Sequence, residues 1–187
     1  KASASILAFD PIERESSLHL TLVQSIIKPD KMDLTIQKCV ELGVSSIRPM
    51  ISQRSVVRIG RDKLDKKLNH WQAIAINACE QSGRTRIPTI LPPLSFDEWL
   101  AAPAKDNEIR LMLMPGDYPR MNTLPDSLPE KPHISLMIGP EGGFTDDEVA
   151  TCQQYNITTL SLGPRILRAE TAAITVTSLL QQSFGDL

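Results

Sequence analysis

Residues 162–174, LGPRILRAETAAI, place two arginines and a glutamate directly before an apolar stretch that reads as a buried helix. Charges at such a place cost free energy unless they are paired, or are held at an exposed end where they can be used. There, Arg165 or Arg168 could stabilise negative charge on a reacting group, and Glu170 could orient the arginine or take a proton. The same charges could instead cap or pair at the helix entrance, which is a common fate of charges near a helix N-terminus. Spacing alone leaves both interpretations open.

Three short apolar runs in the second half of the chain each end in a loop that contains Gly or Pro: LMLMPGD, LMIGPEGGFT and LSLGPRILRAET. Gly139, Gly142 and Gly143 would let the backbone approach a ligand closely, and a helix beginning after Thr145 would offer free N–H groups. The spacing fits neither common nucleotide motif, because Phe144 stands where a P-loop lysine is expected and no G-x-G-x-x-G occurs. Any one of these loops could be a simple turn. Their threefold occurrence favours a shared pocket.

These loops need strands and helices to hold them, and the first half of the chain supplies several. Residues 18–27 and 44–51 are typical of β-strands. Residues 28–43 predict a helix with Asp30 as its N-cap and Gly43 as its terminator. A second helix is predicted over 61–80, with Gly83 beyond its end. Its expected buried stripe comprises Leu64, Leu68, Trp71, Ala75, Ala78 and Cys79.

The second half of the chain continues the alternation of strands and helices. Short strands are predicted near 87–91, at 109–114, at 134–138 and at 157–162. Ser95 with Glu98, and Thr145 with Glu148, have the spacing of capping boxes that open two helices. The last helix is expected over about 170–182. This order predicts one α/β domain with a mainly parallel sheet, and ligands of such sheets bind at the carboxyl ends of the strands.

Composition limits the class of protein. The 187 residues are 41% hydrophobic and 22% charged, as in a soluble globular protein, and the formal net charge of −2 gives no overall nucleic-acid signature. Any RNA-binding surface must therefore be local. The sequence predicts no membrane span, and three widely spaced cysteines and three histidines predict neither a disulfide framework nor a metal site. We therefore expect a reducing, cytoplasmic location.

Four separated segments resemble one known family in the expected order. IGPEGGFTDDEV and LGPRILRAETAAI closely resemble the two C-terminal signatures of the ribosomal RNA small subunit methyltransferase E family. KPDKMDLTIQKCVELGVSSIRPMISQRSVV and WQAIAINACEQSGR are similar to its upstream signatures. The resemblance runs from about residue 18 to 183. It implies methylation of N3 of a uridine in 16S rRNA, with S-adenosylmethionine (SAM) as the methyl donor.

The resemblance also implies a fold and an assembly. The family belongs to the SPOUT class, whose parallel-stranded α/β domain ends in a trefoil knot, and it implies a homodimer with active sites near the subunit boundary. The knot follows from the resemblance alone, since chains as a rule avoid threading loops. Family members carry an N-terminal PUA-type RNA-binding domain. Residues 1–17 are then expected to be the linker from that missing domain, and 18–187 the SPOUT methyltransferase domain.

The matching positions imply roles for individual residues. Arg168 or Arg165 would stabilise charge on the uracil oxygens, while Glu170 or Glu141 would orient that arginine or take the N3 proton. The implied cofactor contacts are Met114, Pro115, Ile138, Gly139, Pro140, Gly142, Gly143, Leu162, Gly163, Ile166, Leu167, Thr171 and Ala172. Thr171 could instead be an N-cap. Candidate substrate contacts are Arg54, Glu80, Gln81 and Arg84, although these residues could also form a solvated polar rim.

Three rival functions remain at this point. The glycine loops could serve a nucleotide-dependent phosphotransferase, but the missing P-loop lysine argues against it. The chain could be a non-catalytic RNA-binding or ribosome-assembly factor with the same fold, or a methyltransferase of another RNA. Intact Arg168 and Glu170 argue against loss of catalysis.

Overall fold

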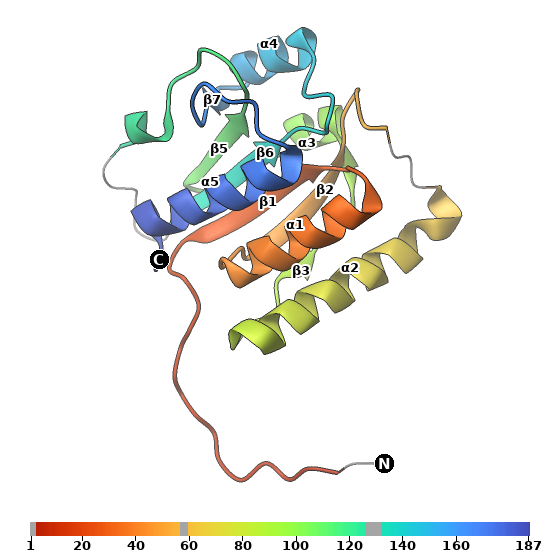
Figure 1. The fold of residues 1–187 in the computed structure, drawn as a ribbon, viewed down its shortest axis with the longest axis vertical. Helices are drawn as coiled ribbons and strands as arrows, with labels where there is room; N and C mark the ends of the chain where they lie inside the picture. Colours follow the sequence, from red (N-terminus) through yellow and green to blue (C-terminus); the bar gives the residue numbers. More distant parts are fainter. Residues whose placement is uncertain (1–2, 57–59, 126–131) are drawn as a thin grey trace.

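A parallel β-sheet forms the centre of the molecule (Figure 1). The computed structural model describes residues 3–56, 60–125 and 132–187. The strands are β1 (His19–Ser25), β2 (Ser46–Ile51), β3 (Thr89–Ile90), β4 (Leu94–Ser95), β5 (Glu108–Leu113), β6 (His133–Ile138) and β7 (Thr158–Leu160). Their order is β3-β2-β1-β6-β5-β7, with β4 also beside β2, and every pairing between them is parallel. The predicted α/β class with a mainly parallel sheet is therefore confirmed.

Helices cover both faces of the sheet (Figure 1). On one face lie α1 (Pro29–Glu41), α2 (Arg61–Ser82) and α5 (Ala169–Phe184), packed around the larger apolar core. On the other face α3 (Phe96–Ala101) and α4 (Asp146–Gln154) cover a smaller core. A short 3-10 helix, η1 (Met121–Thr123), lies between β5 and β6 in the chain. Strands covered on both sides explain the continuous apolar runs in the sequence.

Most predicted helix ends are confirmed. Gly43 and Gly83 have positive φ, 89° and 70°, just beyond α1 and α2, where glycine ends a helix at low steric cost. Both predicted capping boxes are present, Ser95 with Glu98 and Thr145 with Glu148. On α2, Trp71, Ala75, Ala78 and Cys79 are buried as expected, whereas Leu64 and Leu68 are only half-buried.

Two predictions about helix caps are wrong. The N-cap of α1 is Lys28 and not Asp30, because Pro29 takes the first helical position, where its fixed φ and missing N–H cost nothing. Thr171 is not an N-cap either. The N-cap of α5 is Arg168, and Thr171 is an exposed residue of the first turn. In both helices the residue at the N-cap is therefore basic and lies next to the carboxyl edge of the sheet.

Candidate functional site

A cavity of about 460 Å³ opens at the carboxyl edge of the sheet. The loops that follow β5, β6 and β7 all contribute to its wall, together with the first turns of α1 and α5. Its lining residues are Lys28, Lys31, Leu113, Met114, Pro115, Ile138, Gly139, Pro140, Glu141, Gly142, Gly143, Phe144, Leu162, Gly163, Arg165, Ile166, Leu167, Arg168, Ala169, Glu170 and Ala172. The three glycine- and proline-containing loops thus form a single pocket.

Glycine is required in the backbone of this cavity at two positions. Gly143 has φ +68° and Gly163 φ +109°, and a Cβ built at either position would meet no heavy atom within 4 Å. Space is therefore available at both sites, and the requirement for glycine is conformational. The same open space lets a ligand approach the backbone of both loops closely.

Two arginines stand at the mouth of the cavity. Arg165 and Arg168 are both exposed, and neither forms an ion pair or a side-chain hydrogen bond with any other described residue. Arg168 is the N-cap of α5, but its side chain makes no capping bond. The alternative, in which the charges of this stretch pair at a helix entrance, therefore has no support for the two arginines among the described contacts, whereas Glu170 does pair, with Lys31 of α1.

Glu170 pairs with Lys31 of α1 and not with Arg165 or Arg168, the arginines next to it in the sequence. Its side chain is only 9% exposed, and its Oε1 lies 3.5 Å from Nζ of Lys31 on α1. The carboxylate therefore pairs with a lysine more than a hundred positions away in sequence, and Arg168 is left free toward the cavity.

Glu141 also contacts α1. Its Oε1 accepts a hydrogen bond of 3.0 Å from the backbone N–H of Lys28, directly before the helix. This bond satisfies a donor that the helix start would otherwise leave to solvent. Glu141 remains exposed on the cavity wall, so its carboxylate has access to both the helix start and the cavity.

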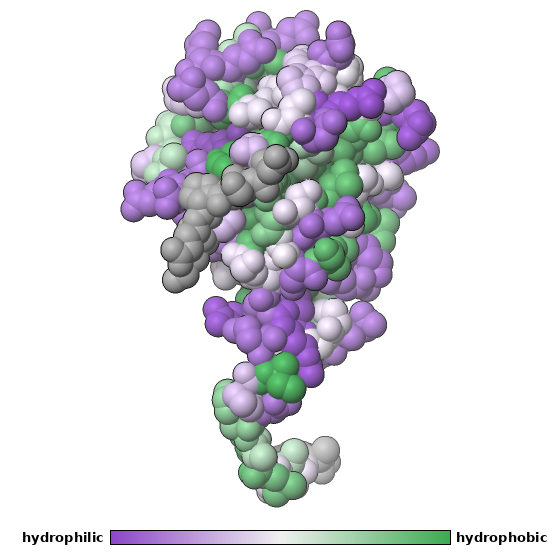
Figure 2. All heavy atoms as spheres, turned by 90° about the vertical axis from the view of Figure 1, so that its left-hand side faces the viewer, coloured by the Kyte–Doolittle hydropathy of each residue, from purple (hydrophilic) through white to green (hydrophobic). Residues whose placement is uncertain are grey.

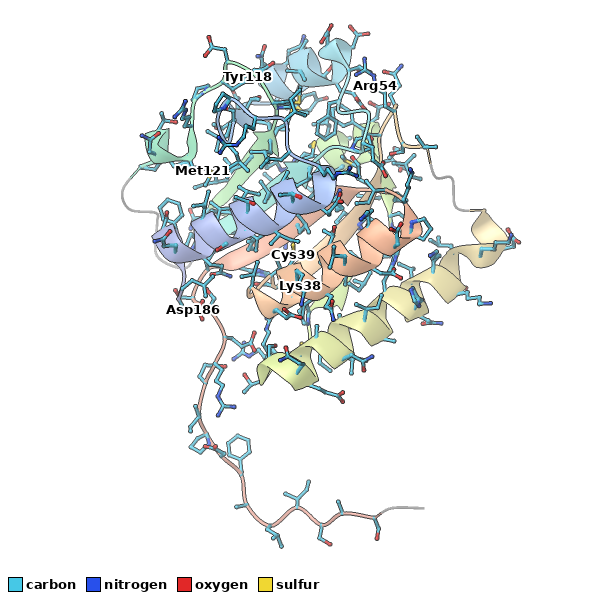
Figure 3. All side chains as sticks on the ribbon, viewed as in Figure 1. Lys38, Cys39, Arg54, Tyr118, Met121 and Asp186 are labelled. Atoms are coloured by element: carbon cyan, nitrogen blue, oxygen red, sulfur yellow. The ribbon has the colours of Figure 1, made fainter. Side chains whose placement is uncertain are left out.

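Arg54 lies beside the cavity and supports its glycine loop (Figure 3). Its Nη1 donates to the carbonyl oxygens of Gly142, at 3.0 Å, and Phe144, at 3.3 Å. A Cβ at Gly142 would lie 3.3 Å from the Cβ of Arg54, so the arginine packs directly on the loop. The guanidinium is thereby committed to backbone carbonyls, although the side chain is exposed.

None of the four candidate substrate residues is in the cavity lining, and the other three make no described contact with its loops either. Glu80 and Gln81 are exposed on the last turns of α2. Arg84 forms an ion pair with Glu15 and donates to the carbonyl oxygens of Val40 and Val44, next to the amino end of β2. These contacts hold the chain before β1 against the body at the edge opposite the cavity. The structure therefore separates Arg84 from Arg168.

Sequence reasoning missed five lining residues: Lys28, Lys31, Leu113, Phe144 and Ala169. Lys28 follows β1, whose carboxyl end lies at the same edge as those of β5 and β6, because β6 pairs with both strands in parallel. The rule that identified the other loops would therefore have found it. Lys31 gives no such signal, because a lysine in a first helical turn is usually solvated. Conversely, Thr171 was predicted to contact a cofactor but does not line the cavity.

The described ranges contain neither a metal-binding cluster nor a membrane-spanning helix. Residues 3–56, 60–125 and 132–187 contain no cluster of three or more His, Cys, Asp or Glu side chains placed to hold a metal ion. Over the same residues, no helix has the length and apolar character needed to cross a bilayer.

Comparisons with known proteins agree on one family. Residues 14–181 match the model of the RNA methyltransferase domain. The chain is 37% identical over 172 residues to ribosomal RNA small subunit methyltransferase E of Buchnera aphidicola, which covers 92% of this chain and 66% of the relative. The chain thus spans about two thirds of that relative's length.

Two solved structures share the fold. A protein of Legionella pneumophila, crystallised with bound SAM, is 41% identical with a TM-score of 0.87, over 94% of this chain and 71% of that one. Ribosomal RNA small subunit methyltransferase E of Neisseria gonorrhoeae, bound to SAM, is 37% identical with a TM-score of 0.86, over 95% of this chain and 71% of that one.

Proposed function

Because the chain belongs to the RNA methyltransferase domain family, we propose that it transfers the methyl group of SAM to N3 of a uridine in 16S rRNA of the small ribosomal subunit. The observation that carries this proposal is the single cavity formed by three strand-end loops, with Arg165 and Arg168 free at its mouth. The names of the similar proteins support the rRNA of the small subunit as the target, and two of their structures contain SAM.

The cavity has the properties that a SAM site requires. Its volume of about 460 Å³ lies within the usual range for small-molecule sites, about 300–1,000 Å³. Leu113, Met114, Ile138 and Leu162 supply apolar walls for an adenosyl group. The open backbone at Gly163 can donate and accept hydrogen bonds, while the Gly143 N–H already donates to the carbonyl oxygen of Pro140. Glu141 places a negative charge on the cavity wall, where a cationic ligand would bind.

The chain's own residues would deal with the acceptor, because SAM supplies a methyl group already activated by its positive sulfur. Uridine N3 carries a proton and is a poor nucleophile until that proton leaves. Arg168, or Arg165, donates to a uracil oxygen and stabilises the negative charge that builds as the proton departs. Glu170 or Glu141 receives the N3 proton or holds it for transfer to water. The N3 lone pair then bonds to the methyl carbon as the carbon–sulfur bond breaks.

The proposal extends to the assembly. A homodimer is supported by Ile166, an apolar residue of the cavity wall that is 85% exposed and that a second copy could cover. An N-terminal PUA-type domain is supported by Ile6, Leu7 and Phe9, exposed apolar residues of a segment that projects from the body (Figure 2). The cytoplasm, where ribosomes are assembled, is the location that fits this function.

Labelled SAM and small subunits that lack the modification provide the test. We expect one labelled methyl group per subunit, recovered as N3-methyluridine after digestion to nucleosides. A methyl group on another base or on other RNA would refute the assigned target. SAM binding without any transfer would instead favour the non-catalytic assembly factor.

A further inference from the structure

The first turn of α1 touches two separate parts of the cavity wall. The backbone N–H of Lys28 donates to Glu141 in the loop after β6, and the side chain of Lys31 pairs with Glu170 at the start of α5. This turn therefore links two segments that each supply a candidate catalytic carboxylate. The helix itself is well anchored, since it packs against both α2 and α5 and Thr35 bonds back to its first turn.

The ion pair between Lys31 and Glu170 is unequally buried, with Glu170 as the more buried partner. The Glu170 carboxylate is 9% exposed, and Lys31 is its one ion-pair or hydrogen-bond partner among the described residues. A nearly buried carboxylate without a neighbouring cation would be costly, and Lys31 supplies that cation. Lys31 also lies 3.9 Å from Asp30, but Asp30 is 72% exposed and solvent screens that contact.

We propose that Lys31 is a positioning residue for the methyl-transfer reaction and that it acts through Glu170. By holding Oε1, the ammonium group fixes the direction of the carboxylate and keeps Glu170 away from Arg168, whose guanidinium then stays available to the substrate. The role of Lys31 rests on the proposed function, because it concerns the acceptor side of that reaction. It also adds α1 to a site whose candidate catalytic residues all lie after β6.

Variants of Lys31 test this role, with Lys38 as the matched control. Lys31→Met should lower kcat for methyl transfer by about 10- to 100-fold, as expected when a catalytic group loses its orientation. Its SAM dissociation constant should stay within about threefold of wild type, since the cavity wall is otherwise intact. Lys31→Arg, which keeps the charge, should restore most of kcat.

Lys38 lies in the last turn of the same helix and pairs with Glu41 at 2.9 Å, with 39% of its side chain exposed against 35% for Lys31 (Figure 3). Lys38→Met therefore removes the ion pair of a lysine as exposed as Lys31, at the other end of α1. It should leave kcat and SAM binding unchanged.

A double variant separates positioning from general damage. If Lys31 acts through Glu170, then Lys31→Met combined with Glu170→Gln should lose no more kcat than Glu170→Gln alone. Additive losses, or full activity of Lys31→Met, would overturn the proposal while the methyltransferase assignment stands. A wild-type protein that binds SAM but transfers no methyl group would instead overturn the proposed function.

Discussion

Arg168 and Glu170 are two positions apart in the chain but have different surroundings. Glu170 points to α1 and pairs with Lys31, whereas Arg168 is exposed at the cavity mouth without a described ionic partner. An exposed guanidinium that is not paired costs little in the free protein and can meet a developing anion. At the scale of single residues, Arg168 is therefore the strongest candidate for stabilising the transition state.

Arg168→Ala should lower the rate of methyl transfer by about 100-fold or more, because a preorganised donor to developing charge is lost. SAM binding, measured by calorimetry, should change by less than about threefold, since in the proposed mechanism Arg168 acts on the uracil and not on SAM. Equal loss of transfer and of SAM binding would contradict this division of roles.

Arg86→Ala provides the control for this experiment. Arg86 is an exposed arginine that pairs with Glu13 at the edge of the sheet opposite the cavity. Its removal deletes another exposed guanidinium and should leave methyl transfer unchanged.

At the scale of elements, two capping boxes with the same sequence spacing differ in burial and in how many segments they connect. In α3, Glu98 is exposed and accepts from the backbone N–H of Ser95. In α4, Glu148 is buried, accepts from Thr145 N–H at 2.8 Å, and also accepts from the backbone N–H of Gln53 at 2.9 Å. Glu148 thus ties the loop after β2 to the loop that lines the cavity.

Glu148→Ala should reduce the free energy of unfolding by about 2–4 kcal/mol, because it leaves the backbone N–H groups of Thr145 and Gln53 without their partner. It should also weaken SAM binding, since the preceding glycine loop loses its support. Glu98→Ala, the matched change in α3, should cost less stability and leave SAM binding intact. Urea unfolding and calorimetry measure both effects, and equal costs for the two variants would contradict the account.

The sequence predicted those features of the elements that are determined by neighbouring residues in the chain. Strand runs, the two capping boxes and the glycines after α1 and α2 have short-range causes, and each is confirmed. The pairing of Lys31 with Glu170 and the contact of Arg84 with Glu15 have no local cause, because they depend on how α1, α5 and the chain before β1 pack. Such long-range pairs require the folded structure.

The site also contains residues that the sequence could place and residues that it could not. Twelve of the thirteen implied cofactor contacts line the cavity, because they follow strands whose carboxyl ends share one edge; Thr171 does not. Of the four candidate substrate residues, Arg54 reaches the cavity loop, while Glu80, Gln81 and Arg84 lie elsewhere. Residue type alone could not distinguish an arginine that faces a ligand from one that fastens a loop. The trefoil knot and the dimer stay predictions.

At the scale of the whole molecule, the edge opposite the cavity carries a buried polar cluster. His133 stacks on His19 with ring centroids 4.3 Å apart, and its Nε2 lies 3.1 Å from Oγ1 of Thr21. Burial lowers the pKa of His133 from 6.5 to about 4, helped by the charges of His19 and Lys105. The folded protein therefore keeps this imidazole neutral in mildly acidic solution.

Acid should destabilise the fold through this group. Between pH 6.5 and about 4, the unfolded chain binds a proton at His133 that the folded protein does not, so the free energy of unfolding falls as the pH is lowered. Each unit of difference between the pKa of the unfolded and the folded state corresponds to at most about 1.4 kcal/mol of unfolding free energy. His133→Gln, which retains a partner for Thr21, should show a shallower fall in urea unfolding across this window and the same pH dependence as wild type above pH 7. Identical slopes below pH 6.5 would contradict the assignment.

The central claim is that the loops after β5, β6 and β7 hold SAM in one cavity, with its transferable methyl group directed toward Arg168. A structure of the protein with SAM bound tests this most directly. We expect the adenosyl group against the backbone of Gly143 and Gly163, and the methyl carbon on the side of the cavity where Arg168 and Glu170 lie. SAM bound outside this cavity, or a methyl group directed away from Arg168, would contradict the account.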